Sequence, residues 1–244
     1  MSADTSIAVE TTLLGRREIA AGTMEFRFAK PPGFAFRAGQ AIELLLPDRG
    51  GGPQDIGHAF SIVSAPFEDG IAIATRMRDS AYKRALGSLP DGAPARLDGP
   101  FGSLTLHKKL ARPAVFVAGG IGITPFVSIL RQAAHDRLAQ DLMLLYTNRR
   151  PEDAAFLEEL QGLERANDRF RLVATMTQMQ ASSRPWQGQT GLLDAETIAA
   201  ATRSLPESIF YLAGPPGMVE ALRKTLAEAG VDEDDIRAEE FFGY

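Results

Sequence analysis

The strongest constraint in this sequence is a change of hydrophobic rhythm close to residue 110. Before it, short runs that alternate apolar and polar residues, such as residues 24–28 (MEFRF), are separated by turn residues, a pattern typical of half-buried strands. After it, short apolar runs alternate with helical patterns, which indicates a parallel sheet covered by helices. We therefore expect two domains, residues 1–110 and 111–244, because residues 107–113 interrupt the pattern.

The predicted elements define the fold class. In the first domain, strands are predicted at residues 7–14, 24–28, 41–46, 59–63 and 71–77, and one helix at residues 80–86. In the second, strands are predicted at residues 114–118, 142–146, 170–175 and 209–213, and helices up to residue 138, at residues 153–163 and at residues 217–229. These elements predict a small antiparallel barrel followed by an α/β, doubly wound parallel sheet.

Composition narrows the chemistry that such a chain can carry. It has 26 Lys and Arg against 31 Asp and Glu, a net charge of −5, so nucleic acid is not an expected partner. It contains no cysteine, which excludes disulfides, a catalytic thiol, and thiolate or iron–sulfur sites built from its own side chains. With three histidines, no metal site is predicted.

Neither a secretory signal nor a membrane span is expected. Residues 1–10 carry two acidic residues and no basic ones, unlike a signal peptide. The uncharged stretch at residues 113–130 reads PAVFVAGGIGITPFVSIL. Its glycines and prolines favour a buried strand, a turn and a helix over a spanning helix. We expect a cytoplasmic protein, and a monomer.

A glycine-rich loop at residues 119–125 (GGIGITP) follows a predicted buried strand and opens a predicted helix. Glycines allow a tight turn and a close approach of the backbone to a ligand. Thr124 suits the N-cap and Pro125 the first helical position, and the free N–H groups of the helix start favour a diphosphate. The spacing departs from the dinucleotide fingerprint G-x-G-x-x-G, and a glycine turn without a ligand is the alternative.

Two further loops belong to the same edge of the predicted sheet. Residues 214–217 (GPPG) again join a buried strand to a helix, and ligands of open α/β sheets bind at the carboxyl ends of the strands. Arg149 and Arg150 follow another strand, where an arginine can hold the 2′-phosphate of a dinucleotide. They slightly favour NADPH over NADH, with a solvated loop as the alternative, and residues 182–184 (SSR) supply another candidate phosphate contact.

The first domain contributes three more motifs, at residues 38–40 (AGQ), 58–61 (HAFS) and 99–102 (GPFG). With the two glycine loops in the same order, the chain resembles the ferredoxin–NADP reductase superfamily. That resemblance implies a two-domain fold, an antiparallel six-stranded Greek-key β-barrel that binds FAD followed by an α/β domain that binds NAD(P). The last residues, 239–244 (EEFFGY), are similar to the aromatic terminus of the family.

The resemblance also implies roles for particular residues. Phe60 would pack on the flavin and Ser61 would hydrogen-bond near its reactive N5, while Glu240 is a candidate proton relay with a plain surface carboxylate as the alternative. Phe242 or Tyr244 would cover the flavin face. The implied catalytic residues are Ser61, Glu240 and Tyr244, and the implied cofactor-binding residues are His58, Ala59, Phe60, Ser61, Thr75, Arg76, Met77, Ser80, Gly120, Gly122, Thr124, Pro125, Arg149, Arg150, Gly214, Pro215, Phe242 and Tyr244.

The chain departs from the family pattern at three positions. His58 stands where most members have an arginine, although the ferric reductase and NADPH oxidase branch has a similar H-P-[FY]-[TS] motif; a neutral imidazole is the weaker anion partner. Met77 replaces the glycine of G-x-x-S, with Lys83 or Arg84 as an electrostatic substitute. Ala213 replaces a frequent cysteine beside the nicotinamide, which bears on the rate of hydride transfer.

The resemblance implies a flavin-dependent oxidoreductase that transfers hydride from NAD(P)H to FAD. Electrons then pass to a separate acceptor, because the chain has no cysteine to hold a cluster of its own. That acceptor would be a protein carrier of the ferredoxin or flavodoxin type, or a small molecule. The alternatives are a free-flavin or ferric reductase that uses flavin as substrate, and a non-catalytic flavin- or nucleotide-binding sensor or interaction module.

Overall fold

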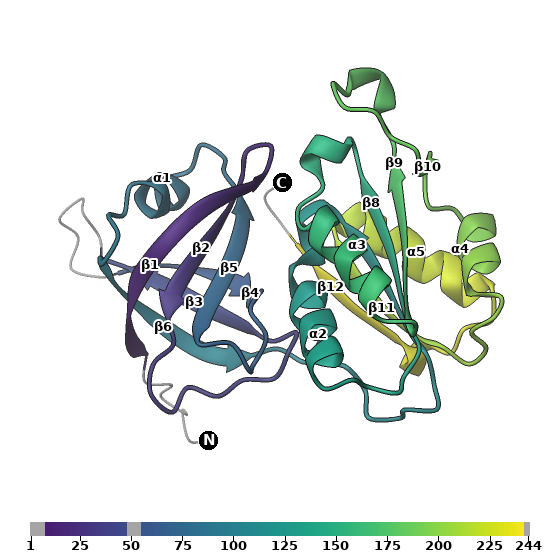
Figure 1. Ribbon diagram of the computed structural model, residues 1–244, viewed down its shortest axis with the longest axis horizontal. Coiled ribbons are helices and arrows are strands. Elements are labelled where there is room, and N and C mark those ends of the chain that lie inside the picture. The colour runs from purple at the N-terminus through teal and green to yellow at the C-terminus, as the bar shows by residue number, and fades with distance from the viewer. Residues whose placement is uncertain (1–7, 48–54, 242–244) are drawn as a thin grey trace.

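The chain folds into two β-sheets that lie side by side (Figure 1). The computed structural model describes residues 8–47 and 55–241. The first sheet contains β1 (Val9–Ala20), β2 (Thr23–Ala29), β3 (Ala41–Leu46), β4 (Ile56–Ser61), β5 (Gly70–Arg76) and β6 (Pro94–Phe101), with α1 (Ala81–Gly87) between the last two. Its order is β4-β3-β6-β1-β2-β5, and every neighbouring pair is antiparallel.

The two edge strands of this sheet, β4 and β5, meet just past the end of β4. The N–H of Val63 donates to the carbonyl of Ala72 (2.8 Å), and the N–H of Ala72 donates to Ser64 Oγ (3.0 Å). The inward-facing side chains of all six strands fill one hydrophobic cluster that includes Phe26, Phe28, Ile42 and Leu97. The six-stranded antiparallel barrel implied by the family resemblance is therefore confirmed.

The second sheet is parallel throughout. It contains β7 (Ala114–Gly119), β8 (Leu142–Asn148), β9 (Phe170–Met176), β10 (Gln189–Thr190), β11 (Ile209–Gly214) and β12 (Ile236–Glu240), in the order β10-β9-β8-β7-β11-β12. The helices α2 (Thr124–His135) and α3 (Leu157–Ala166) cover one face, and α4 (Ala195–Thr202) and α5 (Pro216–Glu228) cover the other (Figure 1). This is the doubly wound α/β fold that the sequence predicts.

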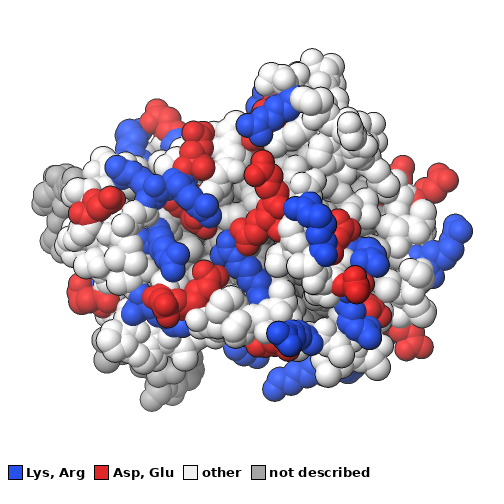
Figure 2. Space-filling model, in the orientation of Figure 1, with Lys and Arg blue, Asp and Glu red and all other residues white. Residues whose placement is uncertain are grey.

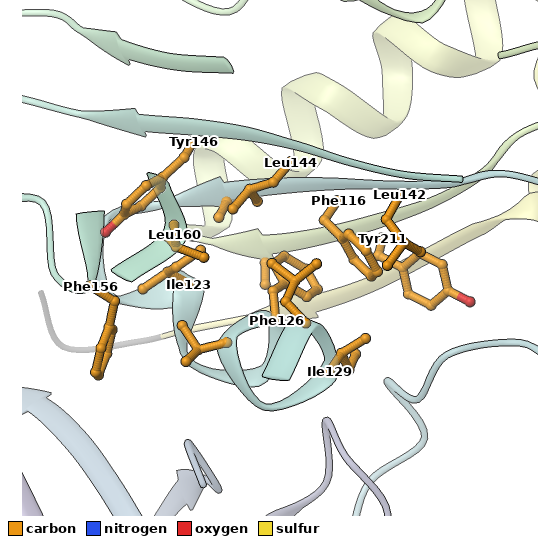
Figure 3. Packing of buried hydrophobic residues seen from close by; sticks show 14 of the residues in the cluster. Phe116, Ile123, Phe126, Ile129, Leu142, Leu144, Tyr146, Phe156, Leu160 and Tyr211 are labelled. Atoms are coloured by element: carbon orange, nitrogen blue, oxygen red, sulfur yellow. The ribbon is translucent and has the colours of Figure 1, made fainter. Parts of the chain in front are cut away.

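Buried side chains on the α2 face reach from one sheet to the other. Phe116 of β7 packs against Phe126 of α2, and Tyr146 and Tyr211 lie in the same cluster (Figure 3). The cluster also contains residues of the barrel, namely Val63, Ala72, Ala74 and Leu104. The edge of the barrel formed by β4 and β5 is thus packed directly onto the start of α2.

Some elements differ from the sequence prediction. Four helices and strands of the described residues lie outside the predicted elements, namely β6, β10, α4 and β12. β6 contains two prolines and a glycine, and β10 has only two residues. α4 buries only Ile198, and β12 (IRAEE) is a largely charged edge strand. α3 begins at Leu157 rather than residue 153. Phe156, in the left-handed region at φ 61°, separates it from the short turn η2 (Pro151–Asp153). Among the described residues, no helix is long and apolar enough to cross a membrane.

Candidate functional site: the cleft between the barrel and the carboxyl edge of the parallel sheet

The two glycine loops interlock at the carboxyl ends of β7 and β11. A Cβ on Gly122 would lie 2.4 Å from the carbonyl oxygen of Ala213, and a Cβ on Gly214 would lie 3.1 Å from the N atom of Gly119 and 2.5 Å from the Met218 side chain. A Cβ atom is essentially never found as close to a backbone oxygen as at Gly122, so that position requires glycine. At Gly214 a side chain would press on the flexible end of Met218 and on the backbone of Gly119, so the neighbouring atoms would have to move. Gly122 therefore serves the contact between the two loops and faces away from open space.

Gly120 is the glycine of the first loop that faces outward. It adopts a φ of +54° and no atom of the described residues lies within 4 Å of a Cβ placed on it, so its backbone is open to a ligand. A short 3₁₀ turn, η1 (Gly120–Ile123), precedes α2, and Thr124 Oγ1 donates to the carbonyl of Ile121 (3.0 Å). The predicted N-cap role of Thr124 is thus wrong, because the first turn opens four residues earlier. Both Thr124 and Pro125 are buried inside the helix start.

The end of β4 carries a buried hydroxyl without a partner. Ser61 is 5% exposed, and its Oγ has no hydrogen-bond partner among the described residues. A buried hydroxyl that lacks a partner is costly, and this one lies at the position where the family resemblance places the flavin ring. Across the β3–β4 ladder Ser61 pairs with Ala41, whose side chain cannot take part in a hydrogen bond.

Phe60 and His58 lie on the other face of β4. Their rings stack with centroids 4.7 Å apart, and Tyr82 of α1 packs against both. Burial, followed by the charge of Glu43, raises the pKa of Tyr82, whose hydroxyl donates to the carbonyl of Leu44 (2.7 Å). Phe60 is 7% exposed, whereas His58 and Ala59 are exposed. In this arrangement the imidazole lies against the phenyl ring that was predicted to receive the flavin.

The end of β5 and the start of α1 form the neighbouring wall. Thr75 is buried, and Met77 donates its N–H to the carbonyl of Gly22 (2.8 Å). Ser80 is the N-cap of α1, and its Oγ accepts from the N–H of Lys83 (3.2 Å). Lys83 donates its Nζ to the carbonyl of Arg76 (2.7 Å). The ammonium that sequence reasoning offered as a substitute charge is therefore bound to this chain's own backbone.

Two arginines bind Asp153 beyond β8, and a third lines a cavity with them. Arg150 binds both carboxylate oxygens of Asp153 (2.8 and 2.9 Å), and Arg76 of the barrel reaches the same carboxylate (3.4 Å). The hydrogen bond from Arg150 is the main cause that lowers the pKa of Asp153, and the charges of Arg150 and Arg76 add to it. These residues line a cavity of about 370 Å³ together with Arg149, which is exposed.

The predicted phosphate contact at residues 182–184 is already occupied by an acidic side chain. Glu152 accepts hydrogen bonds from the hydroxyls of Ser182 and Ser183 (2.8 and 2.9 Å) and from the N–H of Ser183 (2.7 Å). A carboxylate that holds three donors competes with an incoming phosphate. Figure 2 shows acidic and basic side chains close together along the seam between the two halves of the molecule.

The structure packs the barrel edge that carries the predicted flavin residues against the predicted nicotinamide loop. β5 contacts η1, Ala72 and Ala74 of β5 pack in one cluster with Ile123 and Phe126, and the β1–β2 hairpin touches η2 through the N–H of Ala21 and the carbonyl of Glu152 (2.8 Å). The carboxyl edge of the parallel sheet therefore faces the β4–β5 edge of the barrel. A dinucleotide at the first and a flavin at the second would be neighbours.

Comparison with known proteins agrees with this geometry. Residues 116–224 match the family described as oxidoreductase NAD-binding domain. Ferredoxin--NADP reductase B of Sorangium cellulosum (strain So ce56) is 32% identical over 95% of this chain and 97% of its own length. The chain belongs to the ferredoxin–NADP reductase superfamily. It is thus an FAD-dependent NAD(P)H oxidoreductase.

Solved structures and longer relatives fit the same membership. The crystal structure of a ferredoxin NADP+ reductase from Neisseria gonorrhoeae with bound FAD and NADP superimposes with a TM-score of 0.82 at 25% identity, over 96% of this reductase and 99% of that chain. The reductase component of propane 2-monooxygenase from Rhodococcus jostii (strain RHA1) is 27% identical over 87% of this chain. This reductase spans only 57% of that relative.

β12 carries two acidic residues, of which Glu240, and not Glu239, was named as a candidate from the sequence. Glu239 lies directly across from Ala213 in the β11–β12 ladder, and burial raises its pKa. Glu240 is opposite Gly214 and is exposed. Because successive side chains of a strand point to opposite faces, Glu239 and Glu240 lie on opposite faces of β12.

The C-terminal segment of the reductase continues from β12 toward the same loops. The N–H of Phe241 donates to the carbonyl of Gly214 (2.9 Å), and its ring packs on the cluster around α2. Gly214 is buried and Pro215 half-buried. Phe242 and Tyr244, predicted to cover the flavin, lie outside the described residues. The predicted roles of these two residues therefore stay predictions.

Proposed function

We propose that this chain passes electrons from NADPH through FAD to a separate protein carrier of the ferredoxin or flavodoxin type. The observation that carries the proposal is the packing of the β4–β5 edge of the barrel against η1 and the start of α2. Two cofactor sites that share one wall permit direct transfer between their ligands. The domain boundary at residues 110 and 111, a cytoplasmic location and a monomeric state are parts of the same proposal.

On the nucleotide side, we assign the backbone of Gly120 and of the GPPG loop to the coenzyme diphosphate and nicotinamide. Gly120 is open to the outside, and the first N–H groups of a helix attract anions. Gly122 and Gly214 keep the two loops in contact. Arg149 is the exposed cation for a 2′-phosphate, and Arg150 joins it only by leaving Asp153.

On the barrel side, Ser61, Phe60, Thr75 and Ser80 would hold FAD. When bound, FAD supplies the ability to accept two electrons together and to release them singly. Ser61 Oγ would satisfy its free hydrogen bond there, and Glu239 is a better candidate than Glu240 to hold a proton beside the nicotinamide. Its raised pKa, caused by burial, favours the protonated carboxyl.

The test is to purify the protein and add NADPH without oxygen. A yellow protein whose visible flavin absorbance is bleached by NADPH, and which then reduces a ferredoxin or flavodoxin, supports the proposal. A colourless protein that reduces added flavin would identify a free-flavin reductase. A yellow protein that neither NADPH nor NADH bleaches would identify a sensor and overturn the enzymatic proposal.

The coenzyme choice has its own test. The value of kcat/KM is compared for NADPH and NADH in the wild type, Arg149→Ala and Arg150→Ala. We expect Arg149→Ala to lower kcat/KM for NADPH about tenfold and to leave NADH nearly unchanged, because only NADPH carries the 2′-phosphate. An equal loss for both coenzymes would remove the assignment of Arg149.

A further inference from the structure

α2 connects the proposed nicotinamide site to the barrel strand that carries Ser61. Its first turn follows the glycine loop, and Ser128 and Arg131 lie one and two turns later. Ser128 is fully buried and its Oγ donates to the carbonyl of Ser64 (2.7 Å), while Arg131 Nη1 donates to the carbonyl of Val63 (3.2 Å). α2 therefore binds the main chain of the barrel two and three residues beyond Ser61.

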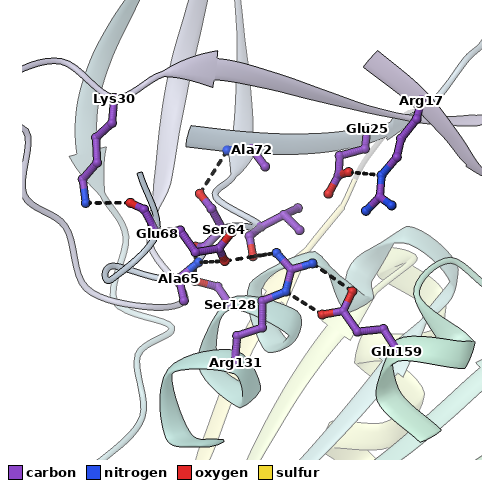
Figure 4. Close-up of polar contacts among 11 residues, drawn as sticks. Arg17, Glu25, Lys30, Ser64, Ala65, Glu68, Ala72, Ser128, Arg131 and Glu159 are labelled. Atoms are coloured by element: carbon purple, nitrogen blue, oxygen red, sulfur yellow. Dashed lines mark hydrogen bonds and ion pairs between the residues drawn. The ribbon is translucent and has the colours of Figure 1, made fainter. Parts of the chain in front are cut away.

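Arg131 is held by carboxylates on both sides of the domain junction (Figure 4). Its Nε and Nη2 bind the two carboxylate oxygens of Glu159 on α3 (2.6 and 2.9 Å), and its Nη1 lies 3.3 Å from Glu68 of the barrel. The guanidinium also lies over the ring of Phe156, 5.7 Å from its centroid. A planar guanidinium that makes directed bonds to three groups has one permitted orientation.

The barrel segment that Arg131 contacts is itself fixed. Glu68 Oε1 accepts from the N–H of Ala65 (2.7 Å), and Lys30 Nζ donates to the carbonyl of Pro66 (2.7 Å). Burial by itself would lower the pKa of Arg131, but the hydrogen bond and charge of Glu159, with Glu68 and Glu25, outweigh it and raise that pKa. The guanidinium is only 14% exposed and stays charged.

A buried ion pair is by itself weak evidence for stability, because desolvation offsets the attraction between the charges. The contact that apolar packing cannot replace is the directed hydrogen bond to the main chain beside the flavin strand. We propose that Arg131 is a positioning residue for electron transfer, which holds the main chain at Val63 against α2 and so fixes Ser61 relative to the coenzyme loop. The proposal rests on the proposed function, since it concerns reduction of the flavin by NADPH.

The test measures flavin bleaching in the FAD-loaded protein by anaerobic stopped flow. For Arg131→Gln we expect the limiting rate at saturating NADPH to fall at least about tenfold, because small misplacements of reacting groups are costly. The NADPH concentration at half-maximal rate should change less than about threefold, since Arg131 does not contact the coenzyme loop. Arg131→Lys should recover part of the rate, because an ammonium keeps the charge but loses the two-pronged bond.

The matched control is Arg169→Gln, which breaks an exposed pair with Asp141 (3.1 Å) at the opposite edge of the sheet. Its limiting rate should equal that of the wild type. An Arg131→Gln protein with a lower Tm but an unchanged limiting rate would overturn the proposal, as would an equal loss of rate in Arg169→Gln. A wild type that NADPH does not bleach would instead overturn the proposed function.

If Arg131→Gln does not fold, Glu68→Gln removes only the charge on the barrel side and leaves the Arg131–Glu159 pair in place. The limiting rate should then fall by about twofold to fivefold while the FAD content stays that of the wild type. An unchanged rate in Glu68→Gln and in Arg131→Lys would overturn the positioning role.

Discussion

The two glycine loops and the β4–β5 edge of the barrel, which face each other, are built in different ways. On the proposed coenzyme side, backbone meets backbone, since Gly122 leaves no room for a Cβ between the loops and Gly214 leaves little. On the proposed flavin side, side chains make the contacts, and they include the hydroxyl of Ser61, which has no hydrogen-bond partner among the described residues, and the stacked rings of His58 and Phe60. The two loops hold each other in place by backbone contacts, whereas the barrel side has polar and aromatic side chains that a bound flavin would contact.

The largest effect is expected from a side chain inserted between the two glycine loops. Gly122→Ala places a Cβ 2.4 Å from the carbonyl oxygen of Ala213, so the loops must separate. We expect a loss of about 3 kcal/mol in unfolding free energy, a fall in Tm of roughly 10 °C and weaker coenzyme binding. Thermal unfolding and NADP⁺ titration measure both effects.

The control for this prediction is Gly217→Ala. Gly217 has no atom within 4 Å of a Cβ position and lies in the first turn of α5, so the change in stability should stay within about 1 kcal/mol. A normal Tm for Gly122→Ala would show that backbone contact does not hold the two loops together.

Smaller effects are expected for Ser64 and Ser61 on the barrel side, where one substitution should lower stability and the other should lower the rate of flavin reduction. Ser64→Ala removes the acceptor of the Ala72 N–H and should cost about 1–2 kcal/mol. Ser61→Ala removes a hydroxyl without a described partner, so Tm should be unchanged or higher, while the limiting rate of flavin reduction falls about tenfold. Chemical denaturation and stopped flow separate the two effects, and a large loss of stability in Ser61→Ala would contradict the contrast.

A further effect is expected at Asp153, which binds Arg76 and Arg150 where the barrel meets the parallel sheet. Arg150 lowers the pKa of Asp153, so the native state gains stability above the unfolded-state pKa of about 3.9 and loses it as pH falls through the lower native pKa. Asp153→Asn should therefore lower Tm near neutral pH and not in strong acid. Because it frees Arg150 and Arg76, the KM for NADPH should fall about twofold to fivefold; an unchanged KM would show that Asp153 does not compete with the coenzyme.

The smallest effect is expected at Glu239. Burial raises the pKa of this carboxyl in the folded chain, so the ionised form destabilises the native state as pH rises through the unfolded-state and then the native pKa. Glu239→Gln should thus raise Tm slightly at about pH 8 and leave it unchanged at about pH 4. Glu240→Gln is the matched control, and an equal pH-dependent gain there would contradict the assignment.

Local patterns could be predicted from the sequence, whereas contacts between residues far apart in the chain could not. The glycine loops and the buried strands around them are local patterns, so the parallel sheet and the family were predictable from residues such as Gly119 and Gly214. The contacts of Arg76 with Asp153 and of Ser128 with the carbonyl of Ser64 join residues that are 77 and 64 positions apart, so they depend on the tertiary path of the chain. β12 was missed because an edge strand of charged residues lacks the hydrophobic alternation that marks a strand.

The cluster that joins Val63 and Ala72 of the barrel to Ile123 and Phe126 of the α/β sheet has a consequence for folding. Domains separated by a polar interface unfold in separate steps, whereas a continuous apolar core couples them. Neither part can lose its structure without exposing apolar surface of the other. Heat or denaturant should accordingly melt the 244-residue chain in one cooperative transition.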